Sequence, residues 1–254
     1  MARLIWDTVG TRKYNTGVDR GVLWTGTVNS TTGATTWSTG VAFQGLRSVD
    51  ANPDGADEQA FYADNMKYLS LRGVENFGGS IGCYYTPEEF DQCDGTASLV
   101  TGVKIGQQVR KPFCFSYRTL VGNDTQGTDL GYEIHIVYNA TVSPSSRSNQ
   151  TVNESPEPLE LSYDFTTNPI EVTGTDFRAI SHIIVASPAL LSLTGTTTPT
   201  LTAYTEYFEK FERNIYGCAA DSTADPAITE HTSHLLLPDQ IKTLFTNGTE
   251  PTFS

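Results

Sequence analysis

Residues 113–138 read FCFSYRTLVGNDTQGTDLGYEIHIVY, and this stretch predicts two antiparallel strands joined by a hairpin loop. Apolar and polar side chains alternate over residues 113–118 and again over residues 130–138. This period of two is typical of a strand that buries one face and exposes the other. Residues 122–129, between the two runs, contain Gly, Asn and Asp, which favour tight turns. So short a connection favours antiparallel pairing.

The rest of the chain extends this β-rich pattern. Residues 158–165, PLELSYDF, alternate in the same way. Thr is abundant throughout, and its β-branched side chain favours strands over helices. We therefore expect a mainly β fold of antiparallel sheets, whose strand edges are available for pairing with other chains.

Helix signals are confined to three places. Residues 86–89, TPEE, combine an N-cap Thr, a first-turn Pro and a capping-box Glu, and predict a short helix that ends near Gly95. Apolar residues at helical spacing predict a longer helix that stops at Gly217. These apolar residues are Leu201, Tyr204, Phe208, Phe211 and Ile215. A further short helix is expected over residues 238–245.

Three other segments predict irregular structure. Residues 49–59 are acidic with Gly and Pro, residues 143–158 are rich in Ser, Asn and Pro, and residues 218–234 are small and polar. Long irregular segments in a folded domain are usually functional or become ordered on a partner. We expect residues 1–20, 49–60 and 143–158 to lie at contacts with neighbouring subunits.

Composition excludes several classes of function. The chain of 254 residues has 29 acidic and 16 basic residues, a formal net charge of −13, whereas nucleic-acid binders are normally basic. Its four cysteines are widely spaced and contain no C-x-x-C pair, which predicts buried thiols and no zinc site. No apolar run is long enough for a membrane span, and no signal peptide is recognisable.

Catalytic and ligand-binding patterns are weak. Glu88, Glu89 and Asp91 are the densest carboxylate set, but helix capping explains the first two. Residues 123–129 resemble a calcium loop only loosely, and turn chemistry explains them as well. His135 and His182 have no nucleophile beside them and are interpreted as structural. Several aromatic residues could form a sugar-binding platform, although packing is the better interpretation. They are Tyr14, Trp24, Trp37, Tyr84, Tyr85 and Tyr117.

A set of short motifs, in this order and spacing, resembles the major tail tube proteins of long-tailed bacteriophages of Gram-positive hosts. The resemblance covers roughly residues 61–245, and no single motif is specific by itself. The motifs are ADNMKYL (63–69), FGGSI (77–81), YTPEEF (85–90), CDG (93–95), IGQQVRK (105–111), YRT (117–119), GND (122–124), LGYEIHIVY (130–138), SPEP (155–158), IYG (215–217) and LLPDQ (236–240).

The resemblance implies one domain, residues 1–254, with two packed antiparallel sheets of the tail tube type, a flanking helix and short helical turns. Its implied parts are an N-terminal arm and long loop (1–60), a β core (61–190) and a helical C-terminal region (191–254). It implies a structural virion protein without catalytic activity or cofactor. Six copies would form a ring, and rings would stack into a hollow tube in the tail, assembled in the host cytoplasm.

The implied partners are further copies of the chain, a tape measure protein, a tail terminator and distal tail proteins. DNA would pass through the tube without specific binding, and no membrane is involved. Acidic side chains on long alternating strands are then the candidates for the channel wall, namely Glu133, Glu160 and Asp164. The alternatives are a capsid or decoration protein, which would form shells, and a carbohydrate-binding tail-fibre module.

Overall fold

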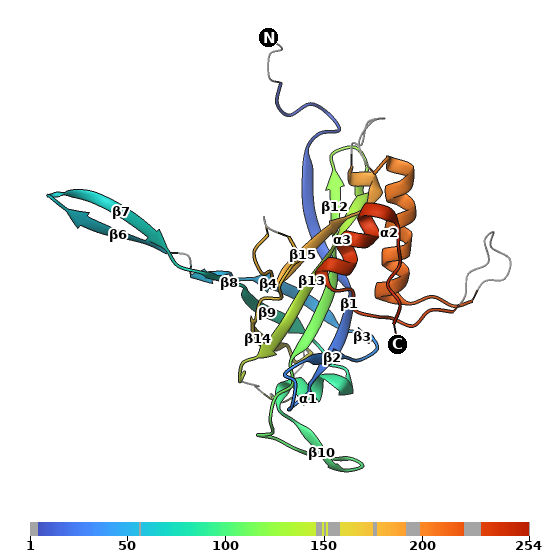
Figure 1. Cartoon of the computed structure of the whole chain (residues 1–254). Coiled ribbons are helices and arrows are strands. Elements are labelled where there is room, and N and C mark those ends of the chain that lie inside the picture. The colour runs from blue at the N-terminus through green and yellow to red at the C-terminus, as the bar shows by residue number, and fades with distance from the viewer. Residues whose placement is uncertain are drawn as a thin grey trace.

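A computed structural model of the chain describes residues 5–55, 57–145, 149, 151, 158–174, 177–191, 199–220 and 230–253. Its body is a nine-stranded antiparallel sheet in the order β2-β1-β12-β13-β14-β9-β4, with β3 also paired to β1 and β15 to β13 (Figure 1). These strands are β1 (Lys13–Val28), β2 (Thr35–Trp37), β3 (Val41–Phe43), β4 (Leu46–Ala51), β9 (Gly78–Cys83), β12 (Phe113–Asn123), β13 (Gly127–Val142), β14 (Leu161–Thr167) and β15 (His182–Ala186).

Three two-stranded sheets and a few helices complete the described chain. The small sheets pair β5 (Asp54–Gly55) with β8 (Glu75–Asn76), β6 (Glu58–Ala63) with β7 (Met66–Arg72), and β10 (Ala97–Val100) with β11 (Val103–Ile105). The helices are η1 (Glu88–Phe90), α1 (Asp91–Asp94), η2 (Pro188–Leu190), α2 (Leu201–Tyr216) and α3 (Pro238–Asn247). The mainly β, antiparallel fold with flanking helices is confirmed.

The predicted hairpin is the centre of the main sheet. β12 and β13 pair from Phe113↔Ala140 to Asn123↔Gly127, and the turn lies between Asn123 and Gly127 as expected. The expected exposed face of this hairpin is absent, because β12 is buried on both faces over residues 113–117. His135, expected on the polar face of β13, is also buried.

The sheet is covered on both sides because it separates two apolar cores. The inner core lies between the β1-β12-β13 part and the β14-β9 part, with α1 contributing from below; it includes Phe43, Ile81, Phe90, Phe115 and Tyr163. The helix-side core lies between the sheet and α2 and α3; it includes Trp24, Ile136, Tyr138, Phe211 and Leu244. The two layers implied by the sequence are therefore parts of one hydrogen-bonded sheet, which bends around the inner core.

A bulge in β13 sets which side chains enter each core. The pairing shifts register between Phe113↔Ala140 and Phe115↔Val137, and Asn139 has a left-handed φ of 47°. Ile136 and Tyr138 lie in the helix-side core, whereas Ala140 and Val142 lie in the inner core. One extra residue reverses the alternation of a strand, so the two ends of β13 can serve different cores.

All three predicted helices are present. α2 begins after Thr200, whose Oγ1 accepts a hydrogen bond from the Ala203 N–H, and ends at Gly217. α3 is followed by Gly248 in a left-handed conformation, φ 72°. The short helix ends at Gly95 as expected, but Thr86 does not cap it: Pro87 takes the N-cap position without a side-chain hydrogen bond.

Two segments that were expected to form an arm and a loop contribute strands to the main sheet. β1, from the expected N-terminal arm, pairs with β12 over residues 13–25, and Trp24 is fully buried. Residues 49–51, expected to be irregular, belong to β4 and pair with β9. Most of residues 143–158 and 218–234 lie outside the described residues. Over the described part, no helix has the length and apolar character needed to cross a membrane.

Candidate assembly surfaces

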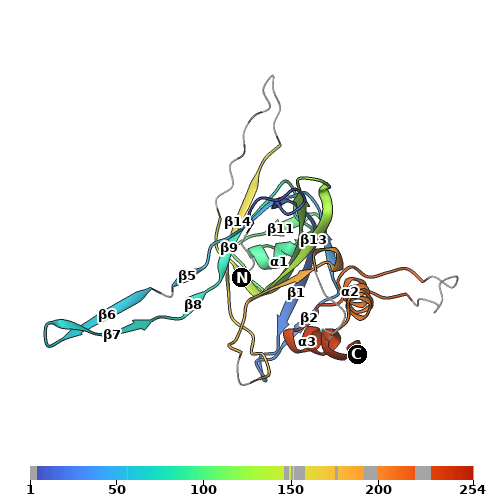
Figure 2. The ribbon, with the colours of Figure 1, turned by 90° about the horizontal axis from the view of Figure 1, so that it is seen from above.

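A free-standing β-hairpin projects sideways from the body (Figures 1 and 2). This lateral hairpin, residues 58–72, consists of β6 and β7 and is joined to the main sheet through a stem formed by β5 and β8. Every residue of β6 and β7 is exposed. The only strand pairing described for the hairpin is between its own two strands, so neither face rests on the body.

The turn of the lateral hairpin explains its local stability. Asp64 and Asn65 have left-handed φ values of 51° and 61°. Two consecutive left-handed residues form the turn that matches the twist of two antiparallel strands, and Asp and Asn tolerate this conformation better than most side chains. Sequence reasoning missed this hairpin, although the Asp-Asn pair between two apolar runs is a signal that could have identified it.

The lateral hairpin is amphipathic. Opposite residues share a face, and the register pairs Gln59 with Leu71, Phe61 with Leu69 and Ala63 with Met66. A bulge at Tyr68, between Phe61↔Leu69 and Tyr62↔Lys67, keeps the apolar residues together. One face thus presents Phe61, Ala63, Met66, Leu69 and Leu71.

The opposite face of the lateral hairpin is charged. Lys67 and Arg72 both form ion pairs with Glu58, the second at 4.0 Å. The hydrogen bond from Lys67 lowers the pKa of Glu58. Because this face satisfies its own charges in water, the apolar face is the one that requires a partner.

Two further apolar protrusions lie at opposite ends of the body (Figure 1). At one end the N-terminal segment exposes Ile5, Trp6 and Val9. At the other end the β10–β11 hairpin exposes several apolar side chains. These are Leu99, Val100, Val103 and Ile105.

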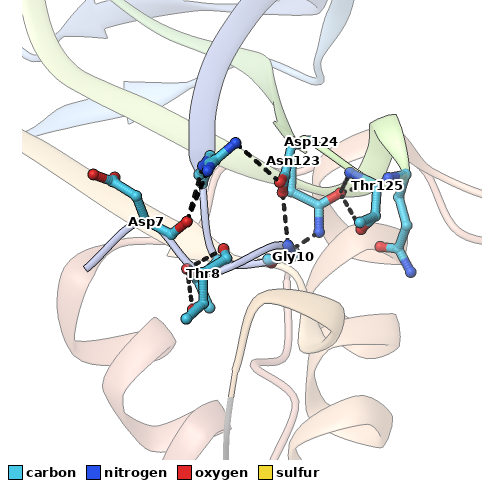
Figure 3. Close-up of polar contacts among 9 residues, drawn as sticks. Asp7, Thr8, Gly10, Asn123, Asp124 and Thr125 are labelled. Atoms are coloured by element: carbon cyan, nitrogen blue, oxygen red, sulfur yellow. Dashed lines mark hydrogen bonds and ion pairs between the residues drawn. The ribbon is translucent and has the colours of Figure 1, made fainter. Parts of the chain in front are cut away.

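The N-terminal segment is fixed to the tip of the β12–β13 hairpin by polar contacts (Figure 3). Asn123 Nδ2 donates to the Gly10 carbonyl at 3.2 Å, and the Gly10 N–H donates to Asp124 Oδ1 at 2.9 Å. Asn123 Oδ1 accepts from the Gln126 N–H at 2.6 Å, and Asp124 lies 3.9 Å from the Arg12 guanidinium. The oxygens of the loosely calcium-like loop therefore serve the turn and this anchor.

The three candidate channel residues do not lie on one face of the sheet. Asp164 alternates with the inner-core residues Tyr163 and Phe165 and therefore faces away from the inner core, in a row with Ser80 and Asp50. Glu160 precedes Asp164 by four residues, a spacing that keeps both on the same face of an extended chain. It forms an ion pair with Arg47.

Glu133 lies on the opposite face of the sheet from Asp164. It precedes His135 and Val137 at a spacing of two on β13, and Val137 lies in the inner core. Its carboxylate accepts a long hydrogen bond of 3.5 Å from Asn15 Nδ2. The structure thus brings Glu160 and Asp164 together and separates Glu133 from them.

The residues considered above for catalysis, metal binding or sugar binding are ion-paired or buried in the structure. Asp91 forms an ion pair with Lys104, and the described residues contain no group of three or more side chains suited to a metal ion. Trp24 and Tyr117 are buried, so they cannot belong to a surface platform for sugars. Burial raises the pKa of the Cys93 thiol to about 12 and also raises that of Cys114, as expected for inert thiols.

The two histidines lie in a stack of rings across the sheet. His135 is stacked on Tyr117 with ring centres 4.6 Å apart, and His182 on Phe77 at 4.8 Å. His135 Nδ1 lies 3.2 Å from His182 Nε2, and His135 Nε2 lies 2.9 Å from the Thr119 hydroxyl. Burial, followed by the neighbouring His182, lowers the pKa of His135 to about 4. Their interpretation as hydrogen-bonded structural residues agrees with these contacts.

Comparison with known proteins gives remote similarities. No protein-family model matches the sequence, and no curated protein matches it. Among solved structures, the chain is similar to the tube terminating cap of the anti-feeding prophage, with 13% identity over 74% of this chain and 97% of that chain and a TM-score of 0.32.

Two components of an extracellular contractile injection system are similar at the same level. The PVC sheath/tube terminator has 14% identity over 68% of this chain and 98% of that chain, with a TM-score of 0.32. A chain of the PVC sheath-tube complex has 15% identity over 66% of this chain and 88% of that chain, with a TM-score of 0.27. With TM-scores below 0.5, these similarities do not identify the function of this chain.

Proposed function

We propose that the chain is a structural subunit of a phage-type tail tube, in which hexameric rings stack around a channel that conducts DNA. The observation that carries this proposal is the lateral hairpin with its uncovered apolar face. A two-stranded hairpin has little stability by itself in water and gains it when its apolar face is buried. The fold thus supplies an element whose stability depends on a neighbouring subunit.

The positions of the protrusions favour a stacked ring. The lateral hairpin leaves the body sideways, while the N-terminal segment and the β10–β11 hairpin mark its two ends (Figure 1). Seen from above, the N-terminal segment lies over the body and the lateral hairpin extends away from it (Figure 2). Contacts between different patches of identical subunits close into rings or continue as filaments. A sideways contact would form the ring, and an end-to-end contact would stack rings.

The sequence resemblance supports the same function. Its ADNMKYL motif, residues 63–69, forms the tip of the lateral hairpin, and its GND motif, residues 122–124, reaches the hairpin tip that anchors the N-terminal segment. We further propose that the protein has no catalytic role or cofactor and acts in the virion, where it contacts a tape measure protein, a terminator and distal tail proteins. DNA passes without specific binding.

The test is electron microscopy of the purified protein at high concentration, with the tail initiator complex added. We expect hollow tubes of uniform width, built from rings with sixfold symmetry. Closed shells would instead identify a capsid or decoration protein, and monomers that bind glycans would identify a tail-fibre module. Rings of another symmetry would refute the hexamer.

A further inference from the structure

A groove lies along the outer edge of β1, beside the end of α2. Two hollows, of about 220 Å³ and about 400 Å³, share the wall formed by Arg20, Gly21 and Ala42. The first hollow ends on Tyr216, and the second extends to Val18 and Leu46. β3, which carries Ala42, lies on the side of the body away from the lateral hairpin (Figure 1).

Arg20 lies in the wall of this groove, which we call the receiving groove. Its guanidinium has no polar partner within the described residues. Arg20 has a left-handed φ of 50° and lies within the register shift of the β1–β12 pairing between Asp19 and Val22. Such a backbone is unfavourable for a side-chain-bearing residue and occurs often at functional sites. Within the described residues Arg20 forms no hydrogen bond or ion pair, and its Cζ lies 5.8 Å from the centre of the Tyr216 ring.

Two buried donors, one of them next to Arg20 and the other behind Gly40, have no acceptor within the described residues. The Tyr216 hydroxyl and the Trp24 Nε1–H are buried and make no hydrogen bond in the described part of the chain. Trp24 is fully buried, and its Nε1 adjoins Gly40, where an added Cβ would lie 2.8 Å from that nitrogen and 1.9 Å from Ser233 Oγ. Gly40, which lines the first hollow, therefore packs too closely against Trp24 and Ser233 to be replaced by a larger residue. Buried polar groups are nearly always paired, so these donors indicate a missing acceptor.

The carboxylates near the groove do not fill this role. Glu212, which acts electrostatically on Tyr216, accepts a hydrogen bond from the Tyr132 hydroxyl at 2.9 Å. Asp19 lines the second hollow, but both of its oxygens accept hydrogen bonds from Arg118, at 2.7 and 2.5 Å. Arg118 is in turn stacked over Tyr132, with its Cζ 4.8 Å from the ring centre. Because Asp19 is neutralised, the groove keeps a positive charge and unpaired donors, and it fits a carboxylate.

We propose that the receiving groove binds the tip of the lateral hairpin of a second copy, with the Asp64 carboxylate opposite Arg20 and the Tyr216 hydroxyl. Asp64 is exposed at the outermost turn of the hairpin, and no hydrogen bond or ion pair of its side chain occurs within the described residues. Ala63 and Met66 beside it would pack against the apolar wall of Val18, Ala42 and Leu46.

The geometry of one subunit agrees with this contact. β3, which carries the groove residue Ala42, lies on the side of the body away from the lateral hairpin (Figure 1), so each subunit can give its hairpin to one neighbour and receive that of the other. This inference rests on the proposed function, since it names the partner of the lateral hairpin within a ring.

Charge exchange tests the contact in the full-length protein. The variants are Arg20→Asp, Asp64→Arg and the combined exchange, with Asp57→Arg and Arg178→Asp as exposed controls of matched charge. Self-association is measured by sedimentation velocity, tubes by negative-stain imaging, and folding by circular dichroism. We expect each single reversal to weaken association at least about tenfold, because like charges would then meet, and the exchange to restore most of it. The controls should associate as the wild type does.

The outcomes separate the two proposals. If folded single variants form normal tubes, the groove is not the receptor, while the tube function stands. If association depends on Arg20 and Asp64 but yields shells, the groove contact stands and the tube function falls. A wild-type protein that stays monomeric with the initiator complex refutes both. A combined exchange that remains as weak as the single variants refutes the direct pairing of the two residues.

Discussion

Phe211 is the residue on which the contact between α2 and the sheet depends most. Its side chain is fully buried in the helix-side core, where its ring lies 6.0 Å from that of Phe208 and 5.8 Å from that of Phe245. We expect Phe211→Ala to lower the free energy of unfolding by about 3–5 kcal/mol, because it removes buried apolar contacts and leaves a cavity.

Chemical denaturation of the protomer measures this loss. The exposed neighbour Glu209 provides the control, since Glu209→Ala should change stability by less than about 0.5 kcal/mol. A loss below about 1 kcal/mol for Phe211→Ala would contradict the buried position of α2.

The stacked histidines make stability depend on pH. The pKa of His135 is lowered to about 4 by burial, and that of His182 is lowered for the same reason, so both are neutral in the folded protein at neutral pH. A lowered folded pKa means that the unfolded chain takes up protons first. Their contribution is therefore complete above the unfolded value, near pH 6.5, and is lost as the pH falls towards 4.

We expect acid to destabilise the wild type by on the order of 2–3 kcal/mol more than His135→Gln over this range. Thermal unfolding of both proteins at matched pH values gives the difference, and the carboxylates that also titrate are common to both. Parallel pH profiles would show that His135 does not contribute.

The lateral hairpin can be removed as a unit because its ends are already paired. Its stem brings Gly55 opposite Glu75 and Asp54 opposite Asn76. We expect replacement of residues 58–72 by a short Gly/Ser turn to leave a folded protomer that does not assemble. Deletion of residues 49–59 is not an equivalent test, because it would remove half of β4 and damage the sheet.

A substitution pair separates the faces of the lateral hairpin. Replacing Phe61, Leu69 and Leu71 by Ser removes the apolar face, while Tyr62→Ser with Ser70→Ala changes the charged face. Only the first set should prevent assembly in negative-stain images. Normal tubes from the excised or the Ser variant would show that the hairpin is not an assembly element.

Sequence patterns predicted those elements whose own side chains determine them. The β12–β13 hairpin, β14 and the helices α2 and α3 have clear periodicity and lie where expected. β1 was missed because its first eight residues, KYNTGVDR, do not alternate between apolar and polar side chains, and because its partner, β12, lies about a hundred residues away. The buried position of His135 was also unpredictable, because it results from β15 and the surrounding aromatic rings.

The sequence predicted that the chain has assembly surfaces, but it did not predict which elements form them. Acidic composition and long polar segments indicated a partner, but the lateral hairpin had been included partly in a loop and partly in the core. The division of Glu133 from Glu160 and Asp164 depends on the bulge at Asn139, which shifts one end of β13 by a residue. A local count of alternation cannot detect such a shift in advance.

At the scale of the whole molecule, net charge bears on DNA passage. In the proposed hexameric ring, six subunits at −13 would give 6 × −13 = −78. A channel wall with carboxylates would repel the duplex, whereas cations would bind phosphates and slow its movement. We expect tubes with Glu133, Glu160 and Asp164 all changed to Lys to form normally and to deliver DNA slowly.

The fold allows the two faces of the sheet to be tested separately. Because Glu160 and Asp164 share a face that excludes Glu133, the double variant Glu160→Lys/Asp164→Lys and the single variant Glu133→Lys should differ, with only one of them slowing delivery. Glu206→Lys on the exposed side of α2 is a control that matches the charge change of the single variant. Infection assays with each variant measure delivery, and unchanged infectivity in the triple variant would refute an acidic channel wall.

The exposed lateral hairpin also makes an unassembled subunit susceptible to proteolysis. Lys67 and Arg72 are sites for trypsin-like cleavage, and both lie on a segment without cover, where little local unfolding is needed to fit a protease. A subunit whose hairpin is buried by a neighbour would be resistant, and one left over would be cut at the segment it needs for incorporation. Limited digestion would thus act as quality control, removing surplus subunits from the assembly pool while sparing finished particles.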